Sequence, residues 1–213
     1  MKTDELIALL AADTVPVAQR GTAWPLGRAV VSGLVLAAIG MQLVLGVRAD
    51  LAQAVLAPMF WMKVIVPAAV AVAGFATLTR LARPGVPART GWAVMAVPIV
   101  LLWWLALAAY VAAPPHARAA LVWGHTWQVC PVNIALFSVP IFVAAFVALR
   151  QLAPTHPGRT GACAGALSGA AGAMIYAFHC PEAALPFMAI WYVVGMAVPL
   201  GVGAWLGPRV LRW

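Results

Sequence analysis

Two cysteines in matching Cys-Pro contexts are the residues best suited to chemistry. Cys130 precedes Pro131, and Cys180 precedes Pro181. Because proline is favoured at the first position of a helix, each cysteine is expected at or beside a helix N-terminus. The helix dipole there stabilises a thiolate and lowers the pKa of the thiol. The pattern therefore predicts two thiols that are more reactive than buried ones.

Three kinds of chemistry fit Cys130 and Cys180. They could form a structural disulfide that joins two helix ends. They could be a sensor that is oxidised or that transiently binds a heavy-metal ion, assisted by His125, His179 or Glu182. They could also exchange disulfides catalytically, which is disfavoured because the chain has no Cys-x-x-Cys pair to pass electrons onward. We favour the sensor and predict no resident cofactor and no catalytic residues.

Two other residues could take part in chemistry. Cys163 lies seventeen helical residues from Cys180, or about 25 Å, and is predicted to be a packing residue. Lys63 lies inside an apolar segment, where an ionisable residue is a functional candidate by default. The carbonyl of Lys63 is also the one that Pro67, four residues later, leaves unpaired. The alternative is a snorkelling lysine that pairs with a carbonyl or with Glu182.

The N-terminus is predicted to form a short helix over residues 3–12. An apolar stripe has acidic residues at both ends, and ten residues are too few for a helix that is stable alone in water. A tail helix tethered by the following linker suggests folding against a groove on a partner protein, although packing beneath the bundle is the alternative. The predicted contact residues are Thr3, Asp4, Glu5, Leu6, Ile7, Leu9, Leu10 and Asp13.

The composition decides the class of protein that carries these residues. Of 213 residues, 65% are apolar and only 8% are charged, whereas a soluble domain has about a quarter charged. A soluble globule, a disordered chain and a coiled coil are therefore excluded. The net charge of +8 comes from scattered residues that form no patch, so no direct binding of nucleic acid is predicted.

An all-α fold follows, a bundle of six transmembrane helices. A helix needs roughly 20 apolar residues to cross a bilayer, and strand periodicity is absent. The predicted domains are a tail over 1–27 and a six-span domain over 28–213. Gly161, Gly165 and Gly169 lie on one face of the fifth span and predict close packing against another helix of the same chain. The predicted spans are 29–47, 55–79, 92–113, 131–149, 161–178 and 185–206.

Orientation follows from the distribution of lysine and arginine in the short loops. One side of the membrane would hold ten of these residues and the other side only Arg48 and Arg118. Both termini are therefore predicted to be cytoplasmic. Cys130 and Cys180 would then lie on the outer side, which is the periplasm in a Gram-negative bacterium.

Several segments together resemble the NrsF-type anti-sigma factors, a family of six-span inner-membrane proteins named as negative regulators of sigma F. The resemblance covers essentially the whole chain. Its segments are Thr3-Asp4-Glu5-Leu6, Trp127 with Cys130-Pro131, His179-Cys180-Pro181-Glu182, Trp191-Tyr192, and Gly207-Pro208-Arg209 with Leu211-Arg212-Trp213.

The resemblance implies a regulator rather than an enzyme. Such proteins hold an extracytoplasmic-function (ECF) sigma factor at the membrane through their cytoplasmic N-terminus. Their two outer cysteines are needed for the response to heavy-metal stress such as chromate or cadmium, a role that carries over to Cys130 and Cys180. The rival interpretations are a small transporter with Lys63 and Glu182 on its path, and a membrane thiol oxidoreductase.

Overall fold

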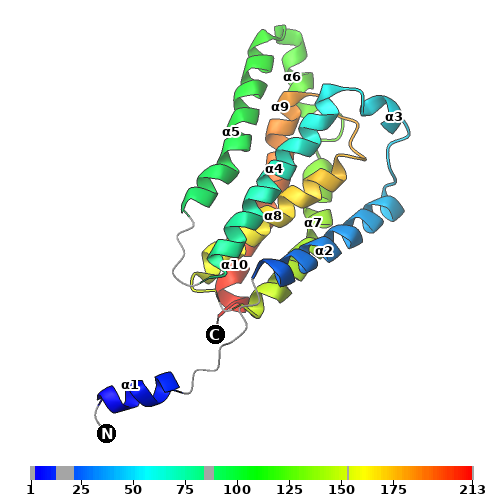
Figure 1. Cartoon of the computed structure of the whole chain (residues 1–213). Coiled ribbons are helices and arrows are strands. Elements are labelled where there is room, and N and C mark those ends of the chain that lie inside the picture. Colours follow the sequence, from blue (N-terminus) through cyan, green and yellow to red (C-terminus); the bar gives the residue numbers. More distant parts are fainter. Residues whose placement is uncertain (1–2, 13–21, 84–88, 153, 213) are drawn as a thin grey trace.

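The structure is a computed structural model that describes residues 3–12, 22–83, 89–152 and 154–212. In this part of the chain all regular structure is helical, which confirms the predicted fold class. The long helices lie side by side in a bundle (Figure 1). The elements are α1 (Thr3–Ala12), α2 (Ala23–Val44), α3 (Leu51–Ala54), α4 (Pro58–Leu81), α5 (Arg89–Ala112), α6 (Pro115–Trp123), α7 (Cys130–Arg150), α8 (Pro157–Tyr176), α9 (Leu185–Phe187), the π-helical turn η1 (Met188–Tyr192) and α10 (Val193–Val210).

Proline starts several helices and interrupts others. It occupies the first turn of α4, α6, α7, α8 and α9, where its missing N–H costs nothing. Pro67, Pro98, Pro140 and Pro199 lie inside α4, α5, α7 and α10, as the sequence predicts.

The bundle has two ends, which we name by their contents. The cysteine end holds α3, α6, α9 and the loop 177–184, at the top of Figure 1. The tail end holds the start of α2 and the C-terminus of the chain, at the bottom of Figure 1. Helices α2, α4, α7, α8 and α10 extend between the two ends, so residues far apart in sequence meet at each.

Five helical segments in the described residues are long and apolar enough to cross a membrane: α2, α4, α5, α7 and the run Leu185–Val210. The predicted number of six spans is therefore not confirmed. The predicted span that is missing from these five is the fifth, 161–178, which corresponds to α8; its 20 residues are rich in Gly and Ala and less apolar. Fifteen of these residues are buried by neighbouring helices. Few side chains of α8 would therefore face lipid, so the helix does not require large apolar residues.

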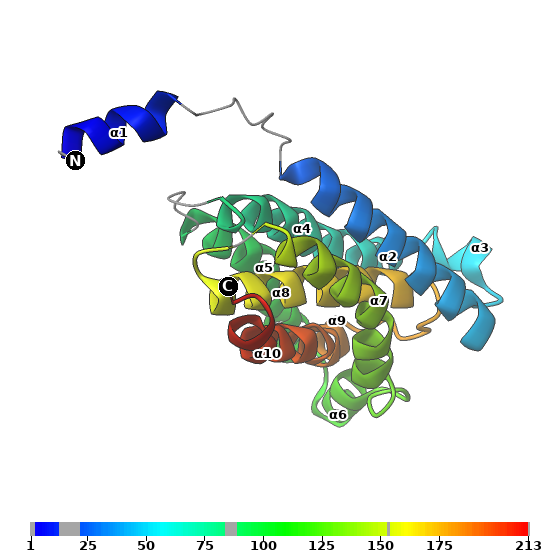
Figure 2. The same cartoon turned by 90° about the horizontal axis from the view of Figure 1, so that it is seen from below.

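Helix α8 is the centre of the bundle. It packs most closely on α10 and also contacts α4, α7 and α2, and Figure 2 shows it among them. A Cβ at Gly165 would overlap the backbone of α10 at Pro199, and one at Gly169 would lie 2.6 Å from the Met196 carbonyl oxygen. The glycine face predicted from sequence therefore does bring two helix backbones of the same chain together.

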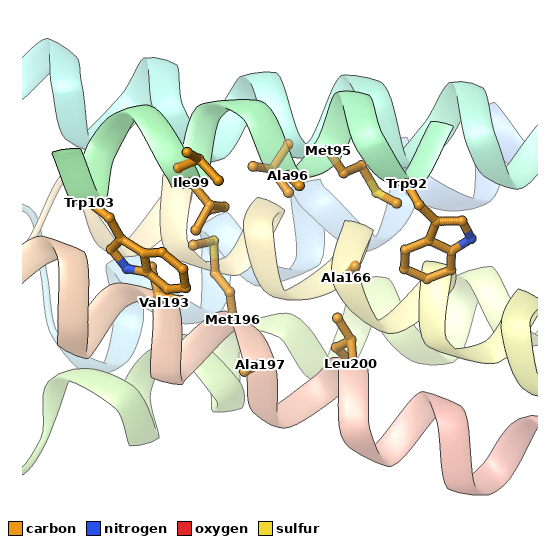
Figure 3. Close-up of a pocket in the computed structure, with 12 residues that line it drawn as sticks. Trp92, Met95, Ala96, Ile99, Trp103, Ala166, Val193, Met196, Ala197 and Leu200 are labelled. Atoms are coloured by element: carbon orange, nitrogen blue, oxygen red, sulfur yellow. The ribbon is translucent and has the colours of Figure 1, made fainter. Parts of the chain in front are cut away.

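An apolar cavity of about 290 Å³ lies between α5 and α10, and Ala166 of α8 is among the residues that line it. Trp92 and Trp103 lie at its two ends (Figure 3). The residues that line it include no charged side chain. The Trp103 indole N–H donates a 2.9 Å hydrogen bond to the carbonyl of Ala189 in η1. The cavity thus offers apolar surface and no reactive group.

Candidate functional site: the thiol pair at the cysteine end

Cys130 and Cys180 meet at the cysteine end although fifty positions separate them in sequence. Cys130 is the first residue of α7, and Cys180 lies in the loop that follows α8. Both are free thiols with no exposed surface. The two side chains lie close enough together for the Cys130 thiol to lower the pKa of the Cys180 thiol.

Two expectations about the thiols are wrong. Cys180 is not at a helix N-terminus, because α9 begins only at Leu185 after an extended Ala184. The thiols are also expected to be unlike buried ones, yet both are fully buried.

Lys63 is 2% exposed and does not reach the surface. Its ammonium donates a 2.9 Å hydrogen bond to the carbonyl of Cys180. The Arg48 guanidinium donates to the same oxygen at 3.1 Å. Of the alternatives left open for Lys63, the structure therefore shows the carbonyl partner rather than Glu182.

The surroundings of Cys180 favour its ionised form. Cys130 as a hydrogen-bond donor lowers the pKa of the Cys180 thiol, burial opposes this, and the Lys63 ammonium lowers it further. A thiolate is the form that binds metal ions and reacts with oxidants. The pair therefore couples a sulfur prepared for ionisation with a second sulfur beside it.

Glu182 and His125 meet, but through the backbone. The Glu182 carboxylate accepts hydrogen bonds from the N–H groups of His125 (2.7 Å) and Thr126 (3.0 Å), and from the Thr126 hydroxyl (3.2 Å). Gly124, with φ +53°, closes the turn, and a Cβ there would lie 2.7 Å from the carboxylate. Glu182 therefore joins the loop after α6 to the loop after α8.

His179 also uses its ring for a structural contact. Its Nδ1 donates a 2.9 Å hydrogen bond to the Gly46 carbonyl just beyond α2. In the described parts of the chain, no three side chains among His, Cys, Asp and Glu lie together as a metal site. The donor set that the geometry offers to a soft ion is thus the two sulfurs.

Sequence reasoning missed Arg48 and Tyr192. Arg48 counted only as a loop charge, yet it binds both Asp50 (2.6 Å) and the Cys180 carbonyl. Tyr192 is fully buried in η1 beside Cys180, and its hydroxyl has no hydrogen-bond partner among the described residues. The Trp191-Tyr192 segment was noted for its resemblance, but nothing in it indicates a π-helical turn.

At the other end of the chain, Thr3–Ala12 forms α1, the range predicted for the tail helix. Asp4 and Glu5 lie in its first turn, and Thr3, Asp4, Glu5 and Ile7 are exposed. Leu6, Leu9 and Leu10 lie on the same helix. Asp13 lies outside the described residues.

Comparison with known proteins shows relatives over the full chain. The probable anti-sigma-F factor NrsF of Azospira oryzae is 40% identical, and the anti-sigma-F factor NrsF of Caulobacter vibrioides is 39% identical; each match covers 100% of both chains. No solved structure matches. The family described as negative regulator of sigma F matches residues 10–213. With a thiol pair at one end of an apolar bundle and a tail helix on the same chain, the protein belongs to the NrsF family of negative regulators of sigma F.

Proposed function

We propose that this protein is a membrane-bound anti-sigma factor that holds an ECF sigma factor through its N-terminus. The names of its full-length relatives support this role. Binding at the membrane keeps the sigma factor away from RNA polymerase. Regulation then requires only that the sigma factor dissociate from the membrane protein.

The bundle lies in the bacterial inner membrane with both termini in the cytoplasm. Five apolar helices of membrane-spanning length support the location, and the distribution of arginine supports the orientation. The sigma factor is cytoplasmic, which is the side that this orientation gives to α1. The thiols then lie on the periplasmic side, where an oxidant or a metal ion arrives first.

Helix α1 is the segment that contacts the sigma factor. Its first turn is acidic, and Ile7 is 59% exposed. An apolar side chain on a short helix gains stability when a partner covers it. Because the helix is ordered at the expense of chain entropy, the complex is reversible.

Cys130 and Cys180 sense heavy-metal or oxidative stress, and their juxtaposition is the observation that carries this part of the proposal. A soft metal cation replaces the two thiol protons with two metal–sulfur bonds. Alternatively, an oxidant such as chromate takes two electrons, the two protons leave, and a sulfur–sulfur bond forms. Either event changes how the loop 177–184 packs against the start of α7. The resulting state has a lower affinity for the sigma factor.

Co-purification of a sigma-F-type factor with the full-length protein tests both the sensing role of the thiols and the binding role of α1. We expect wild-type protein to retain the sigma factor without cadmium chloride and to lose it when cadmium is added. Cys130→Ser with Cys180→Ser should retain it in both conditions, because the soft ligands are gone. Deletion of residues 1–13 should leave an intact membrane protein that retains no sigma factor.

Cys163→Ser is the matched control. The Cys163 thiol is buried in α8 and donates a 3.4 Å hydrogen bond to the Gly74 carbonyl, far from the pair. This variant should release the sigma factor as the wild type does. Normal release from the double variant would refute the sensing role, and wild-type retention by the truncated protein would refute the role of α1.

A further inference from the structure

Three hydrogen bonds join the segment just beyond α2 to the loop that carries Cys180. The Arg48 backbone N–H donates to the Phe178 carbonyl at 3.1 Å. The Arg48 guanidinium donates to the Cys180 carbonyl, and His179 donates to the Gly46 carbonyl. Gly46 has φ +72°, a left-handed conformation that ends α2 and turns the chain toward this loop. The loop therefore cannot shift without straining the end of α2.

The other cysteine also acts on α2, through α7. Cys130 begins α7, and α7 is the principal packing partner of α2. The two backbones touch, since a Cβ at Gly33 would lie 2.6 Å from the Cα of Ile141. Both sulfur-bearing segments thus contact the same helix. Such close backbone packing transmits a displacement rather than absorbing it, because packed interfaces move between discrete arrangements.

Helix α2 begins at the end of the tail. Its first residue is Ala23, and the N-terminal segment precedes it directly. There the Thr22 hydroxyl accepts a 3.2 Å hydrogen bond from Arg83, just beyond α4. Helix α4 is in turn bound to the Cys180 carbonyl through Lys63. The carbonyl of Cys180 is therefore the point at which α2 and α4 are both held at the cysteine end.

We infer that Arg48 is a positioning residue that transmits the state of the thiol pair to α2, and through α2 to the N-terminal tail. This inference rests on the proposed function. When Cys130 and Cys180 join in a metal complex or a disulfide, the Cys180 carbonyl shifts and draws with it the Arg48 guanidinium that is hydrogen-bonded to it. Helix α2, bonded to the same loop, moves with it, and the tail that α2 carries changes its position relative to the bundle.

The test compares Arg48→Gln with the matched control Asp50→Asn in full-length protein bound to a sigma-F-type factor. Arg48→Gln removes the guanidinium from the Cys180 carbonyl. Asp50→Asn alters the other partner of Arg48 and leaves that hydrogen bond in place. Two quantities are measured as cadmium chloride is added: protection of Cys130 and Cys180 from alkylation, followed by mass spectrometry, and the sigma factor retained.

We expect cadmium to protect both cysteines of Arg48→Gln as in the wild type, while the cadmium concentration for half-release of the sigma factor rises at least tenfold. Asp50→Asn should match the wild type in both measurements. Release from Arg48→Gln at the wild-type concentration would overturn the inference. Loss of cadmium protection in Arg48→Gln would also overturn it, because Arg48 would then belong to the thiol site itself.

A second variant guards against a folding defect in Arg48→Gln. His179→Phe keeps a ring beside Tyr176 and removes the donor to the Gly46 carbonyl. In this variant too, cadmium should protect both cysteines while release of the sigma factor requires more cadmium. Release at the wild-type cadmium concentration would count against the connection between the loop and α2. The Cys130→Ser, Cys180→Ser double variant is run alongside. Normal release from that variant refutes the proposed function, whatever Arg48→Gln does.

Discussion

At the scale of single residues, the polar groups of the cysteine end are used to fasten loops. Lys63, Arg48 and His179 all donate to backbone carbonyls, and Glu182 accepts from backbone N–H groups. Buried polar groups need such partners because an unpaired one costs the free energy of desolvation. The thiols of Cys130 and Cys180 are different, since each lies close enough to the other to affect its ionisation. Reactivity at this end is thereby concentrated on the two sulfurs.

Glu182 provides a test that separates anchoring from metal binding. Glu182→Gln keeps a carbonyl oxygen for the N–H groups of His125 and Thr126, whereas Glu182→Ala leaves both donors without this acceptor. We expect Glu182→Ala to lower the free energy of unfolding by about 0.5–1.5 kcal/mol, measured by thermal unfolding in detergent. Glu182→Gln should unfold nearly as the wild type and still release the sigma factor with cadmium. A fully folded Glu182→Gln that no longer responds to cadmium would instead make Glu182 a ligand.

At the scale of elements, the long helices were predictable and the short ones were not. Apolar length defines α4, α5 and α7 to within three residues, because lipid and the interior of the bundle both require apolar side chains. Helix α2 begins six residues before the predicted span. The helices α3 and α6 and the turn η1 depend on loop contacts formed only after the bundle assembles. The same is true of the contacts of Arg48 with the loop after α8, whose residues lie 130 and more positions away. The meeting of Cys130 and Cys180 could be suggested from their matching contexts, but their complete burial could not.

The glycine face of α8 gives a prediction for the assembly of the bundle. Gly165→Val would force a side chain into the backbone of α10 at Pro199 and Leu200. We expect it to destabilise the protein by about 1–3 kcal/mol or more, seen as a lower unfolding temperature in detergent. Gly201→Ala is the matched control, since no atom lies within 4 Å of a Cβ there. Equal unfolding temperatures for the two variants would show that the two helices do not approach this closely.

At the scale of the whole molecule, the structure places the thiol pair and the start of α2 at opposite ends of one bundle (Figure 1). The helix ends gather eight described arginines at the tail end: Arg28, Arg80, Arg83, Arg89, Arg150, Arg159, Arg209 and Arg212. The cysteine end has only Arg48 and Arg118. An asymmetry of this kind sets the orientation of helical membrane proteins, because cytoplasmic loops retain lysine and arginine. In the proposed function, a sensor that faces outward and a binding segment that faces inward require a rigid connection, and we assign that connection to α2.

This orientation is tested with two glutamines, one exposed at each end of the bundle. Gln53 lies in α3 at the cysteine end, and Gln151 follows α7 at the tail end. In spheroplasts, an impermeant maleimide should label Gln53→Cys at once and Gln151→Cys only after the membrane is permeabilised. Wild-type protein is the blank, because its own thiols are buried. Immediate labelling of Gln151→Cys, with Gln53→Cys protected, would mean that the orientation is reversed. The thiol pair would then lie in the reducing cytoplasm, and α1 would lie on the side that has no sigma factor. Both the sensing role of the thiols and the binding role of α1 would be refuted.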